Sequence, residues 1–113
     1  MVAAYCPDAG DIVWIDFDPQ SGREIMKRRP GLVLSKRWFN ERGGLCVVVP
    51  ITSKVKGRQF EVPLTVLTKP SVILSCNVHN FDWRTRNAKF IAKAPDEVLE
   101  EVRETIAALL GID

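Results

Sequence analysis

The feature of this sequence that most limits its fold is a succession of short apolar runs, each ended by glycine, proline or polar residues. Segment 10–18, GDIVWIDFD, places Val13, Ile15 and Phe17 on one side of an extended chain, which is the period-two pattern of a strand. Segments 31–35 and 44–51 are continuous apolar runs, typical of strands buried on both faces. We therefore expect these two segments at the centre of a β-sheet.

Further strands are predicted at 59–66, 72–78 and 87–93, which makes about six in all. Pro63 has no N–H for a ladder, so its strand belongs at an edge or a bulge. Segment 19–30 is predicted as a long loop and 81–86 as a polar connection around Trp83. Segment 96–110 has helical periodicity, with Pro95 before it and Gly111 after it. These elements predict one domain over 1–113 that is mainly β with a C-terminal helix, folded as a small barrel.

Composition excludes several classes of protein. With 46% hydrophobic and 27% charged residues, the chain is too apolar to be disordered. The longest apolar stretch, 45–51, is far shorter than the ~20 residues that cross a bilayer, and the N-terminal segment does not resemble a secretion signal, so we expect a cytoplasmic protein. The cysteines are odd in number and form no C-x-x-C pair, and the single histidine, His79, is predicted to pack or lie at the surface; neither a metal site nor a disulfide is predicted.

Charge is unevenly distributed along the chain although the net charge is only +2. Residues 1–22 carry −4 and residues 95–113 carry −5, whereas residues 23–42 carry +5 and residues 54–93 carry +6. Basic middle segments between acidic ends can fold into one positive face that attracts a polyanion. A mixed, solvated surface is the alternative interpretation of the same charges.

Arginines near predicted loops, with aromatic residues close by in the sequence, are the chemistry-bearing feature of the chain. Guanidinium groups bind phosphates in a forked geometry and aromatic rings stack on unpaired bases, so this mixture suits single-stranded nucleic acid. The sequence contains no glycine-rich phosphate loop, nucleophile elbow, zinc site or paired histidines.

Several motifs in fixed order resemble those of the MazF/PemK-like toxin ribonucleases. They are GDIVWIDFDP, then G-x-E, RPGLVLS, a central strand ending in PIT, a following K-G, an edge strand F-x-V-P and, near the end, W-R-x-R. Each motif is common by itself, but the ordered set is specific and runs from about Tyr5 to Leu110.

The resemblance implies a CcdB/MazF-type fold, an SH3-like barrel with a C-terminal helix that works as a homodimer. It also implies the toxin of a type II toxin–antitoxin system: a cytoplasmic, metal-independent endoribonuclease that cuts single-stranded RNA, including mRNA, at short sequences. The products would carry 2′,3′-cyclic phosphate and 5′-hydroxyl ends. An acidic, partly disordered antitoxin would block the site.

Three residues are carried over by position as catalytic: Glu24, Arg29 and Thr52. Glu24 suits the base that deprotonates the 2′-hydroxyl, Arg29 suits charge stabilisation on the phosphorane, and Thr52 can donate a hydrogen bond to it. Arg29 is expected in an exposed loop, with Pro30 holding its backbone extended. The candidates for RNA binding are Trp14, Phe17, Lys27, Arg28, Ser53, Lys54, Lys56, Arg58, Asn77, Arg84 and Arg86.

Two departures from the usual family pattern are visible. Cys76-Asn77 stands where members often have a pair such as Asp-Gln, and Arg28 stands where one version has histidine. Two other functions remain open from the sequence: a CcdB-like toxin that poisons gyrase without cutting RNA, and a small barrel that only binds nucleic acid or a peptide.

Overall fold

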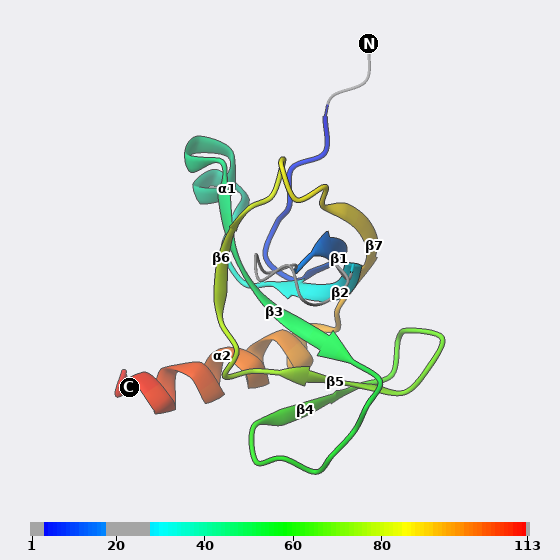
Figure 1. The fold of residues 1–113 in the computed structure, drawn as a ribbon. Helices are drawn as coiled ribbons and strands as arrows, with labels where there is room; N and C mark the ends of the chain where they lie inside the picture. Colours follow the sequence, from blue (N-terminus) through cyan, green and yellow to red (C-terminus); the bar gives the residue numbers. More distant parts are fainter. Residues whose placement is uncertain (1–3, 18–27, 113) are drawn as a thin grey trace, which may run out of the picture.

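The computed structural model describes residues 4–17 and 28–112, and its elements follow one another along the chain as Figure 1 shows. In order they are β1 (Asp11–Asp16), β2 (Arg28–Val33), α1 (Arg37–Gly43), β3 (Leu45–Thr52), β4 (Glu61–Leu64), β5 (Ser71–Leu74), β6 (His79–Asp82), β7 (Lys89–Lys93) and α2 (Asp96–Leu110).

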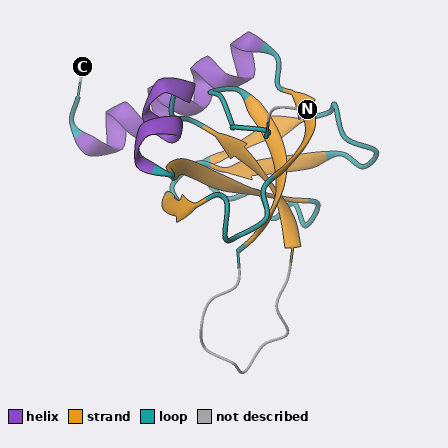
Figure 2. Ribbon diagram, turned by 90° about the horizontal axis from the view of Figure 1, so that it is seen from above, coloured by secondary structure: helices purple, strands orange, loops and turns teal. Residues whose placement is uncertain are grey.

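Within the described residues the strands form one antiparallel sheet of seven strands, in the order β4-β5-β3-β2-β1-β7, with β6 also paired to β3. Strand β3 holds the fold together because its first half pairs with β6 and its end pairs with β5. The sheet consequently curls, and helix α2 lies against one side of it (Figure 2). The predicted central position of β2 and β3 is confirmed, as is the edge position of the strand that contains Pro63.

The two faces of the sheet bury two different clusters, because successive residues of a strand point to opposite sides. One cluster joins Ile12, Leu32 and Val49 to Leu99 and Val102 of α2. The other consists of Cys6, Val13, Ile15, Val33, Cys46, Val48 and Trp83. Neighbouring residues on β2 or β3 therefore face different surroundings.

Helix α2 agrees with its sequence prediction. It begins after Pro95, has Asp96 and Glu97 in its first turn and ends at Gly111, whose φ of 78° is the left-handed conformation that glycine adopts readily. Among the described residues, no helix combines the length and the apolarity needed to cross a membrane.

Three local expectations were wrong. Arg29 lies in strand β2, not in a loop, because β2 already begins at Arg28. Segment 81–86 was expected to be a connection, but its first residues belong to β6, which is held by backbone pairing to β3 despite its polar sequence HNFD. Helix α1 was not expected, and its buried Asn40 explains it: Nδ2 donates to the carbonyls of Pro7 (2.8 Å) and Ser35 (3.0 Å).

Candidate functional site

Arg29 and Thr52 come together because β2 and β3 are antiparallel neighbours. The ladder pairs Val33 with Val48 and Gly31 with Pro50, and the same register continued by two residues sets Arg29 opposite Thr52. By alternation both side chains belong to the face on which Val33 and Val48 are buried. Two residues that lie 23 positions apart in the sequence thus meet at one edge of one face.

The adjacent arginines have different surroundings. One terminal nitrogen of Arg28 donates to Oδ1 of Asp16 (2.8 Å) and the other to the carbonyl of Asn87 (2.8 Å), so Arg28 joins β1, β2 and the turn before β7. Arg29 is exposed, and within residues 4–17 and 28–112 its guanidinium makes no hydrogen bond or ion pair. Its forked donors are therefore available to an anion.

Thr52 is half-buried at the end of β3. Its Oγ1 accepts a hydrogen bond from the backbone N–H of Lys54 (3.1 Å). A hydroxyl that accepts one bond can still donate its own hydrogen, so Thr52 can donate to an oxygen placed beside Arg29.

An aromatic cluster, formed by the rings of Phe17, His79 and Phe81, lies on the same face as Arg29. The centroid of Phe17 is 5.4 Å from that of His79 and 5.3 Å from that of Phe81, and His79 stacks on Phe81 at 4.7 Å. Arg86 lies 3.9 Å from the Phe81 ring centre, and its guanidinium donates to the carbonyl of Asp16 (3.0 Å).

Glycine at position 31 makes this arrangement possible. A Cβ there would lie 2.7 Å from Cγ2 of Val48, which is closer than real side chains approach, and 3.0 Å from Cζ of Phe17, which is tighter than most real contacts. The Phe17 ring therefore covers the backbone of β2 only two residues from Arg29. Phe17 was predicted to bind RNA, whereas His79 was predicted to pack or lie at the surface, because no local pattern indicates that β6 pairs with β3.

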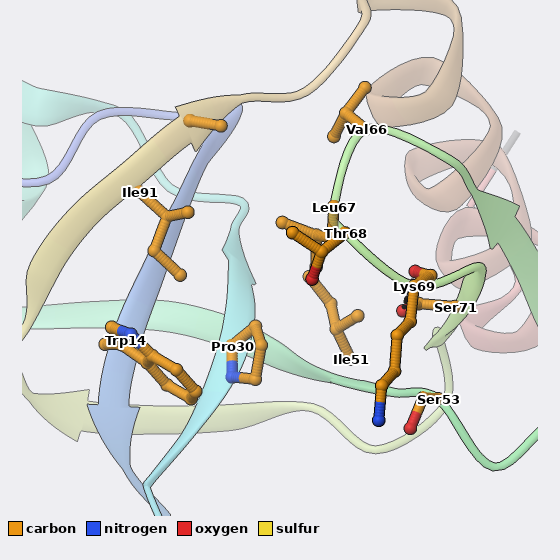
Figure 3. Close-up of a pocket in the computed structure, with 11 residues that line it drawn as sticks. Trp14, Pro30, Ile51, Ser53, Val66, Leu67, Thr68, Lys69, Ser71 and Ile91 are labelled. Carbon is orange, nitrogen blue, oxygen red and sulfur yellow. Dashed lines mark hydrogen bonds between the residues drawn. The ribbon is translucent and has the colours of Figure 1, made fainter.

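The opposite face carries a groove of about 450 Å³ (Figure 3). Trp14 and Pro30 line one side of it, and Ser53 and Lys69 lie on the other. Trp14 is 43% exposed there. Two residues predicted to bind RNA, Trp14 and Ser53, therefore lie on the other side of the sheet from Arg29 and Thr52.

The remaining basic candidates are divided between several places. Lys54 and Lys56 lie exposed in the loop directly after Thr52. Arg58 binds Oε2 of Glu61 (2.7 Å), and this hydrogen bond holds the pKa of that carboxyl below its usual value. Arg58 and Asn77 line a separate cleft of about 310 Å³.

Arg84 lies over the ring of Trp83 (4.5 Å) beside Gly44, at the start of β3. Thr52 is at the other end of that strand, whose eight residues span about 23 Å, so Arg84 is remote from the candidate site. Glu24 and Lys27 lie outside the described residues.

The sequence matches the family model for the PemK-like, MazF-like toxin of type II toxin–antitoxin systems over residues 8–110. The chain belongs to this family. It is 39% identical over 111 residues to the endoribonuclease toxin MazF of Escherichia coli K12, a match that covers 98% of this chain and 100% of that protein. It is also 38% identical over 109 residues to the endoribonuclease toxin ChpB of that strain, covering 91% of this chain and 93% of ChpB.

Solved structures show the same fold. The crystal structure of MazF from Deinococcus radiodurans superposes with a TM-score of 0.87 at 45% identity, covering 96% of this chain and 100% of that one. The MazF chain matched in a crystal structure of the MazE–MazF complex from that organism gives a TM-score of 0.89 at 45% identity, covering 97% and 100%. The predicted MazF-type barrel with a C-terminal helix is thereby confirmed.

Proposed function

We propose that this protein is the toxin of a type II toxin–antitoxin system and an endoribonuclease that cuts single-stranded RNA, with mRNA as its target in the cytoplasm. Family membership and the endoribonuclease relatives support this function. The observation that carries it is the placement of an exposed arginine with no partner among the described residues on the same face as Thr52, beside the aromatic cluster.

The proposed reaction is an internal attack within RNA. The 2′-oxygen loses its proton and forms a bond to phosphorus, the bond from phosphorus to the 5′-oxygen breaks, and that oxygen takes up a proton. The products carry a 2′,3′-cyclic phosphate and a 5′-hydroxyl. The nucleophile belongs to the substrate, so the reaction needs no activated water and we propose that it runs without a metal.

Each catalytic role follows from the chemistry of the side chain. Arg29 offers two parallel N–H donors to the phosphorane oxygens, where negative charge grows in the transition state. Thr52 donates its hydroxyl hydrogen to a neighbouring oxygen. Glu24 is the proposed base, on the strength of its sequence position alone. Because arginine keeps its proton at neutral pH, Arg29 acts mainly through its charge.

RNA binding is proposed to follow the face that carries Arg29. Phe17 offers an aromatic ring to a base, and Lys54 and Lys56 offer phosphate contacts just beyond Thr52. Arg28 and Arg58 form ion pairs with Asp16 and Glu61, respectively. We propose that Arg28 holds the strands beside the site in place and that Arg58 does the same for the loop after Thr52.

Two partners belong to the proposal. The first is a second copy of the chain: the end of α2, the two residues after β2 and Val47 of β3 form an apolar groove of about 340 Å³. The groove includes Leu110 and Ile112, which are 62% and 60% exposed. Burial of such side chains in a homodimer would remove them from water. Sedimentation of the purified protein tests this, and a strictly monomeric species would refute it.

The second partner is an acidic, partly disordered antitoxin that blocks the site. Crystal structures of MazE–MazF complexes from Deinococcus radiodurans, whose MazF is a relative of this chain, support an antitoxin partner. An acidic segment suits the basic residues around Arg29, because opposite charges speed association and favour the correct partner. Co-expression with a MazE-type antitoxin should suppress the toxicity of this chain, and undiminished toxicity would contradict this partner.

The decisive experiment is incubation of the protein with a long single-stranded RNA in EDTA, followed by sequencing of the fragment ends. Discrete cuts with 5′-hydroxyl ends are expected from the wild type and none from Arg29→Ala. RNA that is bound but intact would indicate a binding module. Intact RNA together with inhibition of gyrase would indicate a CcdB-like toxin, and either result would overturn the nuclease.

A further inference from the structure

The imidazole of His79 lies half-buried against the rings of Phe17 and Phe81. Neither of its ring nitrogens has a hydrogen-bond partner in the part of the chain that the structure describes. Among the described residues, the fully buried side-chain polar atom that lacks a hydrogen bond is Oγ of Ser75, so the two nitrogens of His79 still reach solvent and are open to a ligand. The mechanism proposed above makes no use of this residue.

The ring of His79 is also held in one orientation. Backbone pairing of His79 with Val48 fixes its strand, Phe81 covers one face of the imidazole at 4.7 Å and 30°, and Phe17 meets it edge-on at 77°. Arg86 lies over the Phe81 ring, 3.9 Å from its centre. A ring fixed in this way presents its nitrogen atoms in a defined direction, as recognition of one chemical group requires.

The position of His79 places those nitrogens near the reacting phosphate. The Phe17 ring that touches His79 lies over Gly31, and Gly31 follows Arg29 on the same face of β2 after about 7 Å of strand. A base attached to a phosphate bound at Arg29 can therefore reach the aromatic cluster. Unpaired bases commonly lie against aromatic rings in proteins that bind single-stranded RNA.

The charge state of the imidazole suits hydrogen bonding to a base. Burial, and secondly the positive charge of Arg86, lower the pKa of His79 below its ordinary value, so the ring is neutral at pH 7. A neutral imidazole has one nitrogen that donates and one that accepts. A neutral imidazole can therefore distinguish a base atom that donates a hydrogen bond from one that accepts it. A lysine or arginine that binds phosphates cannot, because every nucleotide carries the same phosphate.

From these observations we propose that His79 determines sequence specificity by hydrogen-bonding the base of a nucleotide that stacks on Phe17 next to the cleaved phosphate. The ligand is an unpaired nucleobase of single-stranded RNA, and the inference rests on the proposed nuclease function. His79 contacts the base and takes no part in making or breaking bonds to phosphorus.

The test compares the cut-site profiles of His79→Phe and wild type by sequencing the 5′-hydroxyl ends that each leaves on the same RNA. Phenylalanine keeps an aromatic ring against Phe81 and removes both nitrogens. We expect His79→Phe to go on cutting the preferred sites while its discrimination at one position of the cut sequence falls about tenfold, the size of one hydrogen bond.

Asn80→Ala is the matched control. Asn80 is the next residue of the same strand, is exposed and pairs with Val47, so its side chain points away from the aromatic cluster. Its cut-site profile should be that of wild type. Should His79→Phe fail to fold, His79→Gln, which keeps a donor and an acceptor, and His79→Leu, which has neither, provide the same comparison.

The outcomes separate this inference from the function on which it rests. Cutting by wild type with an unchanged profile for His79→Phe overturns the inference alone, and so does a folded His79→Phe that cuts nothing, because a base-reading residue changes which sites are cut. If the wild type cuts no RNA at all, the nuclease proposal fails first and this inference fails with it.

Discussion

Two adjacent arginines should respond to alanine substitution in opposite ways. Arg28 is bonded to Asp16 and to the Asn87 carbonyl, whereas Arg29 is exposed without a partner in the described part of the chain. We therefore expect Arg28→Ala to lower stability with little direct effect on the chemical step. Arg29→Ala should abolish most cutting and leave stability unchanged.

The expected sizes follow from the contacts. The ion pair of Arg28 with Asp16 is partly exposed and is worth at most about 1 kcal/mol, and the hydrogen bond to Asn87 adds about 1 kcal/mol. Arg28→Ala should thus lower the free energy of unfolding by about 1–2 kcal/mol, or Tm by about 4–8 °C for a chain of this length. Loss of one preorganised donor to a developing oxyanion lowers kcat by about 100- to 1,000-fold, which is the loss expected for Arg29→Ala.

The measurements are urea denaturation followed by circular dichroism, and single-turnover cleavage of a short fluorescent RNA with one cut site. Arg29→Lys is a useful third variant, since it keeps the positive charge and loses the forked pair of donors. Its cleavage rate should lie between those of wild type and Arg29→Ala. Equal destabilisation by Arg29→Ala and Arg28→Ala would refute these separate roles. So would a fully folded Arg28→Ala whose kcat falls as far as that of Arg29→Ala.

Other variants test the same face of the sheet. Gly31→Ala puts a Cβ 3.0 Å from Phe17, so we expect a loss of about 1–3 kcal/mol in urea denaturation and slower cleavage as the ring is displaced; wild-type values for both would contradict the packing described here. Thr52→Val keeps the shape and removes the hydroxyl, and single-turnover kinetics should show kcat lowered about tenfold with stability within about 0.5 kcal/mol of wild type. The pKa of His79 is lowered in the folded state by burial and by Arg86, so the unfolded chain binds more protons below pH about 6.5 and stability should fall as pH decreases through that range. Urea denaturation of His79→Phe at pH values from about 5 to about 8 should lack this part of the pH dependence. If the free energy of unfolding of this variant varies with pH as it does in wild type, the prediction is wrong.

Local sequence patterns were enough to predict the strands that make the centre of the sheet. Apolar runs at 31–35 and 44–51 became β2 and β3, and the periodicity of 96–110 became α2. Patterns failed where an element owes its existence to distant groups. The short helix α1 is tied down by the buried side chain of Asn40, and the polar β6 is a strand because β3 offers it a backbone ladder.

Motif order and residue chemistry led from the sequence alone to the toxin family and to Arg29 and Thr52 as partners. Those conclusions require only the identity and the order of the residues, and the sequence supplies both. Which neighbour of a pair faces the site is decided by strand register, because a shift of one residue turns every side chain to the other face. Register sets Arg29 beside Thr52, commits Arg28 to Asp16 and sends Trp14 and Ser53 to the opposite groove. The position of His79 is decided by tertiary structure alone. His79 lies beside Phe17 because β6 pairs with β3 and because Gly31 leaves space for the Phe17 ring, and no local sequence pattern predicts either contact.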